Sequence, residues 1–456
     1  MLGLPWAKGG LVLKVYIETL GCAKNRVDSE IMMASLVAGN FQPTADPARA
    51  EVILVNSCGF LTEAVEESVE RVLDLSKYKT EGACKLLVFA GCATERYREA
   101  LLDELPELDA ILGTSDYTQI LALVNQALLT GERASWLAAR PGYDMANLTA
   151  PRILSTLPHF AWLKIAEGCS NRCSFCNIPA LRGGFSSKPI KNVVQEAQAL
   201  IKQGVKELNL ISQDSSSFGV DKDEDLLGLA QALSALEGDF WVRLFYCYPN
   251  RFPLGLLDVM AKDPRLVPYL DIPFQHVNDR ILKAMNRQIK GAALFKLLEQ
   301  ARQKLPELSF RTSLIVGFPG ETKAEFKEML SFVESGAVDH LGVFVYSDED
   351  NIKSQKLPKK IGLKEKEERR GLLMEAQQQV SFAKNQKRVG NRIKILVEGT
   401  SKETELLLEG RHQGQGPEVD GSVLINEGQA IAGTWAEVEI VEAMPYDLVA
   451  RILEEE

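Results

Sequence analysis

Three of the eight cysteines in this 456-residue chain lie within eight residues. They are Cys169, Cys173 and Cys176, in the segment "GCSNRCSFC", and their spacing is C-x3-C-x2-C. In a reducing compartment, clustered cysteines are more often metal ligands or catalytic groups than disulfide partners. Three thiolates with a fourth ligand such as His159 would close a structural zinc site. Three thiolates on a [4Fe–4S] cluster would instead leave one iron open for reaction.

Three further cysteines share one position in the local pattern. Cys22 follows the apolar run "VYIETLG", Cys58 follows "VILVNS" and Cys92 follows "LLVFAG". If these runs are parallel strands, the cysteines lie along one sheet edge, where α/β folds bind their ligands. The pattern therefore predicts a second three-thiolate site. Cys84 precedes a strand and Cys247 lies inside one, and both are interpreted as small buried apolar residues.

The surrounding elements predict three blocks. Residues 12–130 alternate apolar runs with helical stretches, which predicts a parallel sheet covered by helices, and residues 131–157 are interpreted as a connector. Residues 158–375 contain six apolar runs separated by helical patterns, which predicts a partial (βα)6 barrel. Residues 385–453 combine short strands with Gly-rich turns, which predicts a small all-β barrel. The predicted fold class is α/β with this all-β domain appended.

Composition narrows the class of protein. The chain is 46% hydrophobic and 25% charged, and no apolar run reaches the roughly 18 residues that span a bilayer. Its first residues lack the basic segment and cleavage site of a secretory signal, so a cytoplasmic protein without a membrane anchor is predicted. A net charge of −10 argues against a broad electrostatic grip on nucleic acid.

The string "CSNRCSFC", with Phe175 just before its last cysteine, resembles the signature of radical S-adenosylmethionine (SAM) enzymes. The resemblance implies that these cysteines hold a [4Fe–4S] cluster whose open iron binds SAM and cleaves it reductively to a 5′-deoxyadenosyl radical. It also implies five SAM contacts, namely Phe175, Gln213, Gln275, Thr312 and Gly317. The alternative for Gln275 and Thr312 is that they only satisfy buried backbone groups.

With the N-terminal cysteines and the terminal barrel included, the chain resembles the radical SAM methylthiotransferases from end to end. This resemblance implies an enzyme that converts C–H into C–S–CH3, with SAM as both methyl donor and radical source. It implies two [4Fe–4S] clusters and a TRAM-type barrel at the end of the chain. The implied metal ligands are Cys22, Cys58, Cys92, Cys169, Cys173 and Cys176.

The segments "TLGCAKNRVDSE", "NSCGFLTEAVEES" and "LISQDSSSFG" are similar to one branch of these enzymes. That branch modifies the β-carbon of an aspartate in the small-subunit ribosomal protein of the decoding centre. The branch that modifies tRNA adenosine is the alternative, but "GQN" would be expected there in place of "SQD". An iron–sulfur electron carrier or redox sensor is the non-enzymatic alternative, for which closed four-thiolate clusters would be expected.

The resemblance implies three partners: a basic ribosomal protein as substrate, a reductase or flavodoxin-type electron donor, and a sulfur source. Charge supports the first of them. Residues 381–456 contain eight Lys and Arg against fourteen Asp and Glu, a formal charge of −6. An acidic barrel is expected to repel tRNA and attract a basic protein. We therefore expect a separable docking module at the C-terminal end, whose removal leaves SAM cleavage intact.

Overall fold

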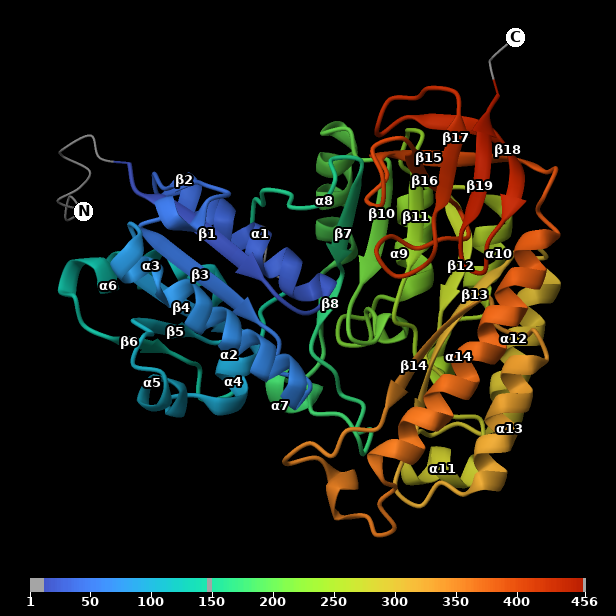
Figure 1. Cartoon of the computed structure of the whole chain (residues 1–456), viewed down its shortest axis with the longest axis horizontal. Helices are drawn as coiled ribbons and strands as arrows, with labels where there is room; N and C mark the ends of the chain where they lie inside the picture. The colour runs from blue at the N-terminus through green and yellow to red at the C-terminus, as the bar shows by residue number, and fades with distance from the viewer. Residues whose placement is uncertain (1–11, 146–149, 454–456) are drawn as a thin grey trace. The chain divides into compact units, whose positions relative to one another are not determined.

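A computed structural model describes residues 12–145 and 150–453, which form two compact units (Figure 1). The first unit contains the described residues up to Ser155, together with Ala166–Asn171 and Cys176–Ser186. The second contains Thr156–Ile165, Arg172–Phe175 and the described residues from Ser187 onward. Most of the N-terminal stretch tested for a secretory signal lies outside the described residues. Within the described ranges, no helix combines the length and apolarity needed to cross a membrane.

The first unit is built on a six-stranded parallel sheet, so the predicted α/β fold is confirmed. Three of its strands were predicted as apolar runs. The other three have only two or three residues, too few to show a periodic pattern, and one of them lies in the predicted connector. In spatial order the strands are β2 (Gln42–Pro43), β1 (Lys14–Thr19), β3 (Val52–Ser57), β4 (Leu86–Gly91), β5 (Ala110–Leu112) and β6 (Ala134–Trp136).

Helices cover both faces of this sheet (Figure 1). On one face α2 (Thr62–Ser76) buries Val65, Val72 and Leu75 against β3 and β4, and on the other α1 (Ala23–Ala38) packs beside α6 (Ile120–Thr130). Strand order β2-β1-β3 places the topological switch point between β1 and β3, where open α/β sheets bind ligands. The unit's shorter elements are α3 (Tyr78–Glu81), α4 (Cys92–Tyr97), α5 (Ala100–Glu104), β8 (Ala166–Glu167), α7 (Ile178–Arg182) and β9 (Ser186–Ser187).

The second unit begins with six parallel strands, as the six apolar runs predicted. In spatial order they are β14 (His340–Val345), β13 (Ser309–Val316), β12 (Leu266–Asp271), β11 (Trp241–Leu244), β10 (Glu207–Ile211) and β7 (Phe160–Lys164). The connecting helices are α8 (Ile190–Lys202), α9 (Leu226–Ser234), α10 (Gly255–Lys262), α11 (Asp279–Ala284), α12 (Gly291–Lys304) and α13 (Lys323–Glu334). Cys247 lies just beyond β11 rather than inside it, and it is buried as expected.

The long helix α14 (Leu363–Gln386) leads to a closed five-stranded barrel, which confirms the predicted all-β domain (Figure 1). Its strands are β15 (Arg392–Thr400), β16 (Leu408–His412), β17 (Val423–Glu427), β19 (Leu448–Ile452) and β18 (Trp435–Ala443). Alternate residues point inward, as the period of a strand requires. Pairs such as Ile395 and Val397, or Val438 and Ile440, therefore form the barrel core.

The small barrel is joined to the parallel sheet by a buried network of charges. Glu207, at the start of β10, accepts hydrogen bonds from Arg243 at 2.8 Å and from Arg411 of β16 at 2.6 Å. Arg411 also donates to Glu398 at 2.7 Å. Burial alone would raise the pKa of Glu207, but the two guanidinium groups hold that pKa below its ordinary value.

A second part of the network surrounds Asp420, in the segment between β16 and β17. Its carboxylate accepts a hydrogen bond from the Tyr269 hydroxyl at 2.7 Å and lies 3.4 Å from both Arg311 and His340. These three partners lie on β12, β13 and β14. Charged side chains of residues 411–420 therefore form ion pairs with strand residues near the amino-terminal end of the sheet. The barrel is not the separable module that its sequence suggested, because its removal would strip partners from buried Glu207, Arg243 and Arg311.

We predict that Arg411→Met lowers the free energy of unfolding by about 3–5 kcal/mol, because breaking a buried ion pair leaves uncompensated charge. Chemical denaturation of the full chain measures this. Arg451→Met is the matched control in the same barrel. Its ion pair with Glu439 is solvent-exposed, so a much smaller loss is expected. Equal losses in both variants would contradict a special role for the buried network.

The stability difference between wild type and Arg411→Met should also depend on pH. Burial opposes ionisation of Glu398, but His159 and Arg411 hold its pKa at about 2, and the pKa of Glu207 is also lowered. Groups with lowered folded-state pKa values contribute stability above their unfolded pKa of about 4.3, and lose it as the pH falls. The difference in the free energy of unfolding between wild type and Arg411→Met should thus be largest near neutral pH and should decrease below about pH 4.

Candidate functional site

The first unit brings Cys22, Cys58 and Cys92 to the carboxyl edge of its sheet. They follow β1, β3 and β4, which are neighbours in the strand order, and all three are free thiols. Cys22 and Cys58 flank the topological switch point between β1 and β3. Cys84, at the opposite edge, is buried in the hydrophobic core under α2, as its position before β4 predicted.

Glycines beside these cysteines let the three loops approach one another. Gly21 has φ +90°, and a Cβ there would lie 3.0 Å from Cys58 Cβ and 3.3 Å from Cys58 Sγ. A Cβ at Gly59 would lie 2.4 Å from the backbone of Cys92. A side chain at either glycine would force the cysteine loops apart, so both positions preserve the convergence of the thiols.

The three thiols lie close enough to affect one another's ionisation. Burial raises the pKa of Cys58, and the neighbouring Cys22 raises it further. Burial likewise raises the pKa of Cys92 to about 11, with Arg182 opposing the shift and Cys22 and Cys58 adding to it. Ionisation of one thiol therefore raises the pKa of its neighbours, and metal binding would have to release their protons.

Among residues 12–145 and 150–453, no three His, Cys, Asp or Glu side chains converge on one metal ion. Each cysteine of a [4Fe–4S] cluster binds a different iron atom, so its ligands stand farther apart than those of a single zinc ion.

Asn25, on the first turn of α1, lies among the three cysteine loops. Its side-chain nitrogen donates to Leu20 O at 3.0 Å and to Ser57 O at 2.8 Å, which fixes the backbone just before Cys22 and Cys58. This orientation turns its oxygen toward the thiols, 3.9 Å from Cys22 Sγ and 3.8 Å from Cys92 Sγ. Sequence reasoning missed Asn25, although its position three residues after Cys22 was visible.

The cysteines of the C-x3-C-x2-C motif divide between the two units, and each is described within its own. In the first unit, Cys169 is buried and its backbone N donates to Gly183 O at 3.1 Å. Asn177, which follows Cys176, donates its side-chain amide to Phe60 O at 3.0 Å. In the second unit, Arg287 Nη1 lies 3.9 Å from Cys173 Sγ.

All five predicted SAM contacts lie in the second unit. Phe175 packs against a buried cluster that includes Met285 and Phe318, and Gln213 is half-buried just after β10. Gln275 has a φ of 69° and pairs by its backbone with β13. Thr312 is fully buried. Its hydroxyl donates to Ile272 O at 2.8 Å and accepts from Phe274 N at 3.0 Å, which matches the alternative that it serves the backbone. The five contacts stay predictions.

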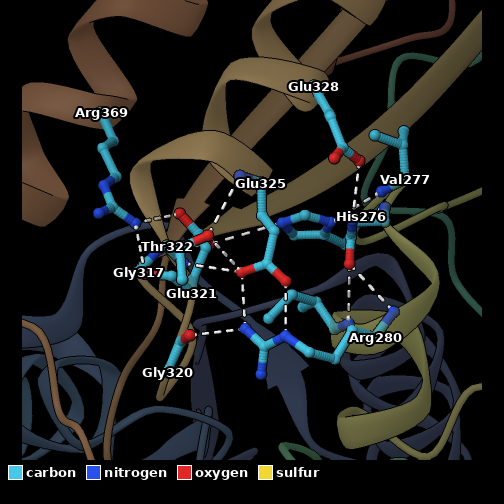
Figure 2. A network of polar contacts seen from close by, with 12 residues as sticks. His276, Val277, Arg280, Gly317, Gly320, Glu321, Thr322, Glu325, Glu328 and Arg369 are labelled. Atoms are coloured by element: carbon cyan, nitrogen blue, oxygen red, sulfur yellow. Dashed lines mark hydrogen bonds and ion pairs between the residues drawn. The ribbon is translucent and has the colours of Figure 1, made fainter.

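A buried network holds the loop that carries Gly317, the last of these residues (Figure 2). Glu321 accepts a hydrogen bond from Gly317 N at 3.0 Å, and its carboxylate also pairs with Arg369 of α14 and lies 3.7 Å from His276 Nε2. His276 Nδ1 accepts from the backbone N–H groups of Val277 and Asn278, both at 3.0 Å. Glu321 thus joins α14 to the segment after Gln275 and to the Gly317 loop.

The same loop ends in a tightly capped helix (Figure 2). Thr322 and Glu325 form a capping box at the start of α13, and Glu325 accepts two hydrogen bonds from Arg280, each at 2.6 Å. Arg280 also donates to Gly320 O at 2.7 Å. The hydrogen bonds from Arg280 hold the pKa of Glu325 at about 2, although partial burial opposes the shift. The loop between Gly317 and Thr322 is therefore fixed at both ends.

Three family models match the chain. They are the uncharacterized protein family UPF0004 over residues 14–113, the radical SAM superfamily over 163–333 and the TRAM domain over 389–453. These matches agree with the order of the three predicted blocks. The predicted domain boundaries themselves stay predictions.

Curated proteins named "Ribosomal protein uS12 methylthiotransferase RimO" match almost the whole chain. The protein of Anaeromyxobacter sp. (strain K) is 45% identical over 446 residues, which cover 97% of this chain and 94% of the relative. The protein of Syntrophotalea carbinolica is 44% identical, with 97% of each chain covered. The chain belongs to the RimO family. The predicted family and the predicted enzyme class, a radical SAM methylthiotransferase, are therefore confirmed, and neither alternative gains support.

Solved structures share the fold at low sequence identity. The radical SAM methyltransferase TsrM from Kitasatospora setae superposes with a TM-score of 0.55 at 14% identity, over 73% of each chain. The cobalamin-dependent SAM radical enzyme OxsB superposes with a TM-score of 0.50 at 10% identity, over 80% of this chain and 56% of that one. Membership of the radical SAM superfamily implies one [4Fe–4S] cluster and SAM as cofactors.

We predict that Arg369→Leu weakens SAM binding by about tenfold, equivalent to about 1.4 kcal/mol, because it leaves buried Glu321 uncompensated beside Gly317. Equilibrium binding of SAM to the reconstituted full chain measures this. Arg370→Leu is the matched control, since the neighbouring Arg370 forms an exposed pair with Glu367. Unchanged SAM affinity in Arg369→Leu would show that the Glu321 network does not contribute to SAM binding.

Proposed function

We propose that this chain transfers a methylthio group to ribosomal protein uS12, replacing a C–H bond at the β-carbon of an aspartate with C–S–CH3. Full-length identity of 41–45% to uS12 methylthiotransferases carries the proposal. The reaction needs this cofactor chemistry because an aspartate β-C–H is neither acidic nor electrophilic enough for general acid–base attack. The cofactors supply a carbon radical and a sulfur carrier, and the protein supplies position and shelter.

A second [4Fe–4S] cluster in the first unit is part of this proposal. Cys22, Cys58 and Cys92 would hold it, and Cys169, Cys173 and Cys176 would hold the cluster that binds SAM. The convergence of three thiols at one sheet edge supports the assignment, as does the amide of Asn25 between them. Three protein ligands would leave one iron open in each cluster, which suits reaction rather than simple electron storage.

The acidic barrel is a weaker guide to the partner than its sequence suggested. Glu398 and Asp420 form buried ion pairs with Arg411 and Arg311. The three terminal glutamates lie outside the described residues. Between residues 392 and 452, the exposed charged side chains are the acids Glu403, Glu405, Glu418, Glu427, Glu437 and Glu442 and the bases Arg392, Lys394, Lys402 and Arg451. Six exposed acids against four exposed bases leave this surface with an excess of negative charge that is smaller than the formal charge of the block.

The remaining partners follow from the proposed chemistry. Reductive SAM cleavage requires a one-electron donor, for which we propose a reductase or a flavodoxin-type protein. A sulfur source must replace the atom that leaves with each product. We also propose that the reaction takes place in the cytoplasm, where ribosomal proteins are made.

We predict about eight irons per fully reconstituted chain, since each cluster contributes about four. Changing Cys22, Cys58 and Cys92 to Ala should halve the iron and leave SAM cleavage to 5′-deoxyadenosine, while thiolation stops. Changing Cys169, Cys173 and Cys176 to Ala should also halve the iron but abolish SAM cleavage. Iron analysis measures the iron content of each variant, and chromatography of 5′-deoxyadenosine measures SAM cleavage. Cys84→Ala is the control and should keep all the iron; two clusters in the first triple variant would refute the N-terminal assignment.

Cells that lack the gene should contain uS12 lighter by one methylthio group than cells that carry it, and re-expression should restore the mass. Intact-protein and peptide mass spectrometry of uS12 measure this and locate the modified residue. Complementation with the Cys22, Cys58 and Cys92 triple variant is the matched control and should leave uS12 unmodified. Loss of a methylthio group from tRNA adenosine, with uS12 unchanged, would overturn the proposal in favour of the tRNA branch.

A further inference from the structure

Arg182 is a buried arginine with four partners in the first unit. It ends α7, six residues after Cys176, and its side chain is 2% exposed. Nη1 lies 2.8 Å from Asp28 Oδ2 and 3.1 Å from Glu167 Oε2, and Nη2 donates to the side-chain oxygen of Asn25. Nε lies 3.3 Å from Cys92 Sγ. A side chain six residues beyond the C-x3-C-x2-C motif thus reaches a cysteine of the other proposed cluster.

These contacts reach all three loops of the N-terminal cysteines. Arg182 contacts Cys92 directly, and it contacts Asn25, whose amide nitrogen holds the carbonyls of Leu20 and Ser57. Those carbonyls stand just before Cys22 and Cys58 in the chain. A guanidinium presents its N–H donors in a fixed planar fork, so the geometry of one contact constrains the others.

An ion pair alone does not account for this geometry. Asp28 and Glu167 already offset the charge of Arg182, and both are bound by the same nitrogen, Nη1. The other two nitrogens point to the sulfur and to the amide beside it. Burying a guanidinium costs several kcal/mol unless its donors are satisfied, so the sulfur occupies the place of a required acceptor.

We propose that Arg182 is a positioning residue of the N-terminal cluster, which donates a hydrogen bond to Cys92 sulfur as an iron ligand and raises the cluster's reduction potential. This inference rests on the proposed second cluster. Hydrogen bonds to ligand sulfurs are among the factors that set cluster potentials, since they favour the reduced state with its extra negative charge. A residue six positions beyond the C-x3-C-x2-C motif thereby affects how easily the N-terminal cluster is reduced.

The test uses the full-length chain with Cys169, Cys173 and Cys176 changed to Ala, so that the N-terminal cluster alone is present. After anaerobic reconstitution, the cluster is reduced stepwise with dithionite at measured solution potentials, and the growth of its electron paramagnetic resonance signal gives the midpoint potential. Arg182→Met should shift that potential to a lower value. Arg182→Lys, which keeps the charge but loses the planar fork, should shift it less.

Arg152→Met is the matched control, since Arg152 forms a buried ion pair with Glu30 in the same unit. It should lower stability without moving the potential. If Arg182→Met unfolds the chain, Arg182→Met combined with Asp28→Asn and Glu167→Gln removes both uncompensated carboxylates and is measured instead. A reconstituted chain without iron would mean that the N-terminal cluster itself is wrong. A cluster with an unchanged potential in the Arg182 variants would overturn this inference while leaving the proposed function intact.

Discussion

The parallel register of β1, β3 and β4 is the constraint on which the first unit depends. Parallel neighbours end at the same edge, so a cysteine just after each strand must meet the other two. Strand order β2-β1-β3 adds the topological switch point, which separates the loops after β1 and β3 enough to admit a ligand. Glycines at 21 and 59 then allow the backbones to approach. An antiparallel pairing of the same three runs would have sent one thiol to the far edge.

Buried arginines hold the segments that strand geometry leaves unconstrained. Arg411 joins the small barrel to β10, Arg369 joins α14 to the Gly317 loop, and Arg182 joins α7 to the N-terminal cysteine loops. A buried ion pair contributes little net stability compared with apolar packing, but breaking one is costly. Such pairs therefore suit positions where a single alignment matters more than stability. Each of these arginines sits beside a candidate site or at a junction within its unit.

Burial of charge also explains why the terminal barrel differs from what its composition suggested. Counting acids in the sequence treats each as a surface charge, but Glu398 and Asp420 face inward and pair with arginines. The Glu398–Arg411 pair cancels within the block, and Asp420 is offset by Arg311 outside it, so these two acids add no negative charge for a partner to meet. Charge counts predict solubility and long-range attraction, and they fail where ion pairs are internal.

The sequence by itself determined the fold class, the six strands of the second unit, the closed barrel and the place of Cys22, Cys58 and Cys92 at one sheet edge. Strand period and the position of a residue just after a strand are local properties of the chain. It missed β2, β5 and β6, whose two or three residues are too short to show a period. It also missed Asn25, whose only local signal was its position three residues after Cys22, and Arg182, which nothing local distinguishes from an ordinary surface residue. Only the tertiary structure decided their roles, because contacts such as Arg182 with Cys92 join residues 90 positions apart, and sequence spacing carries no record of them.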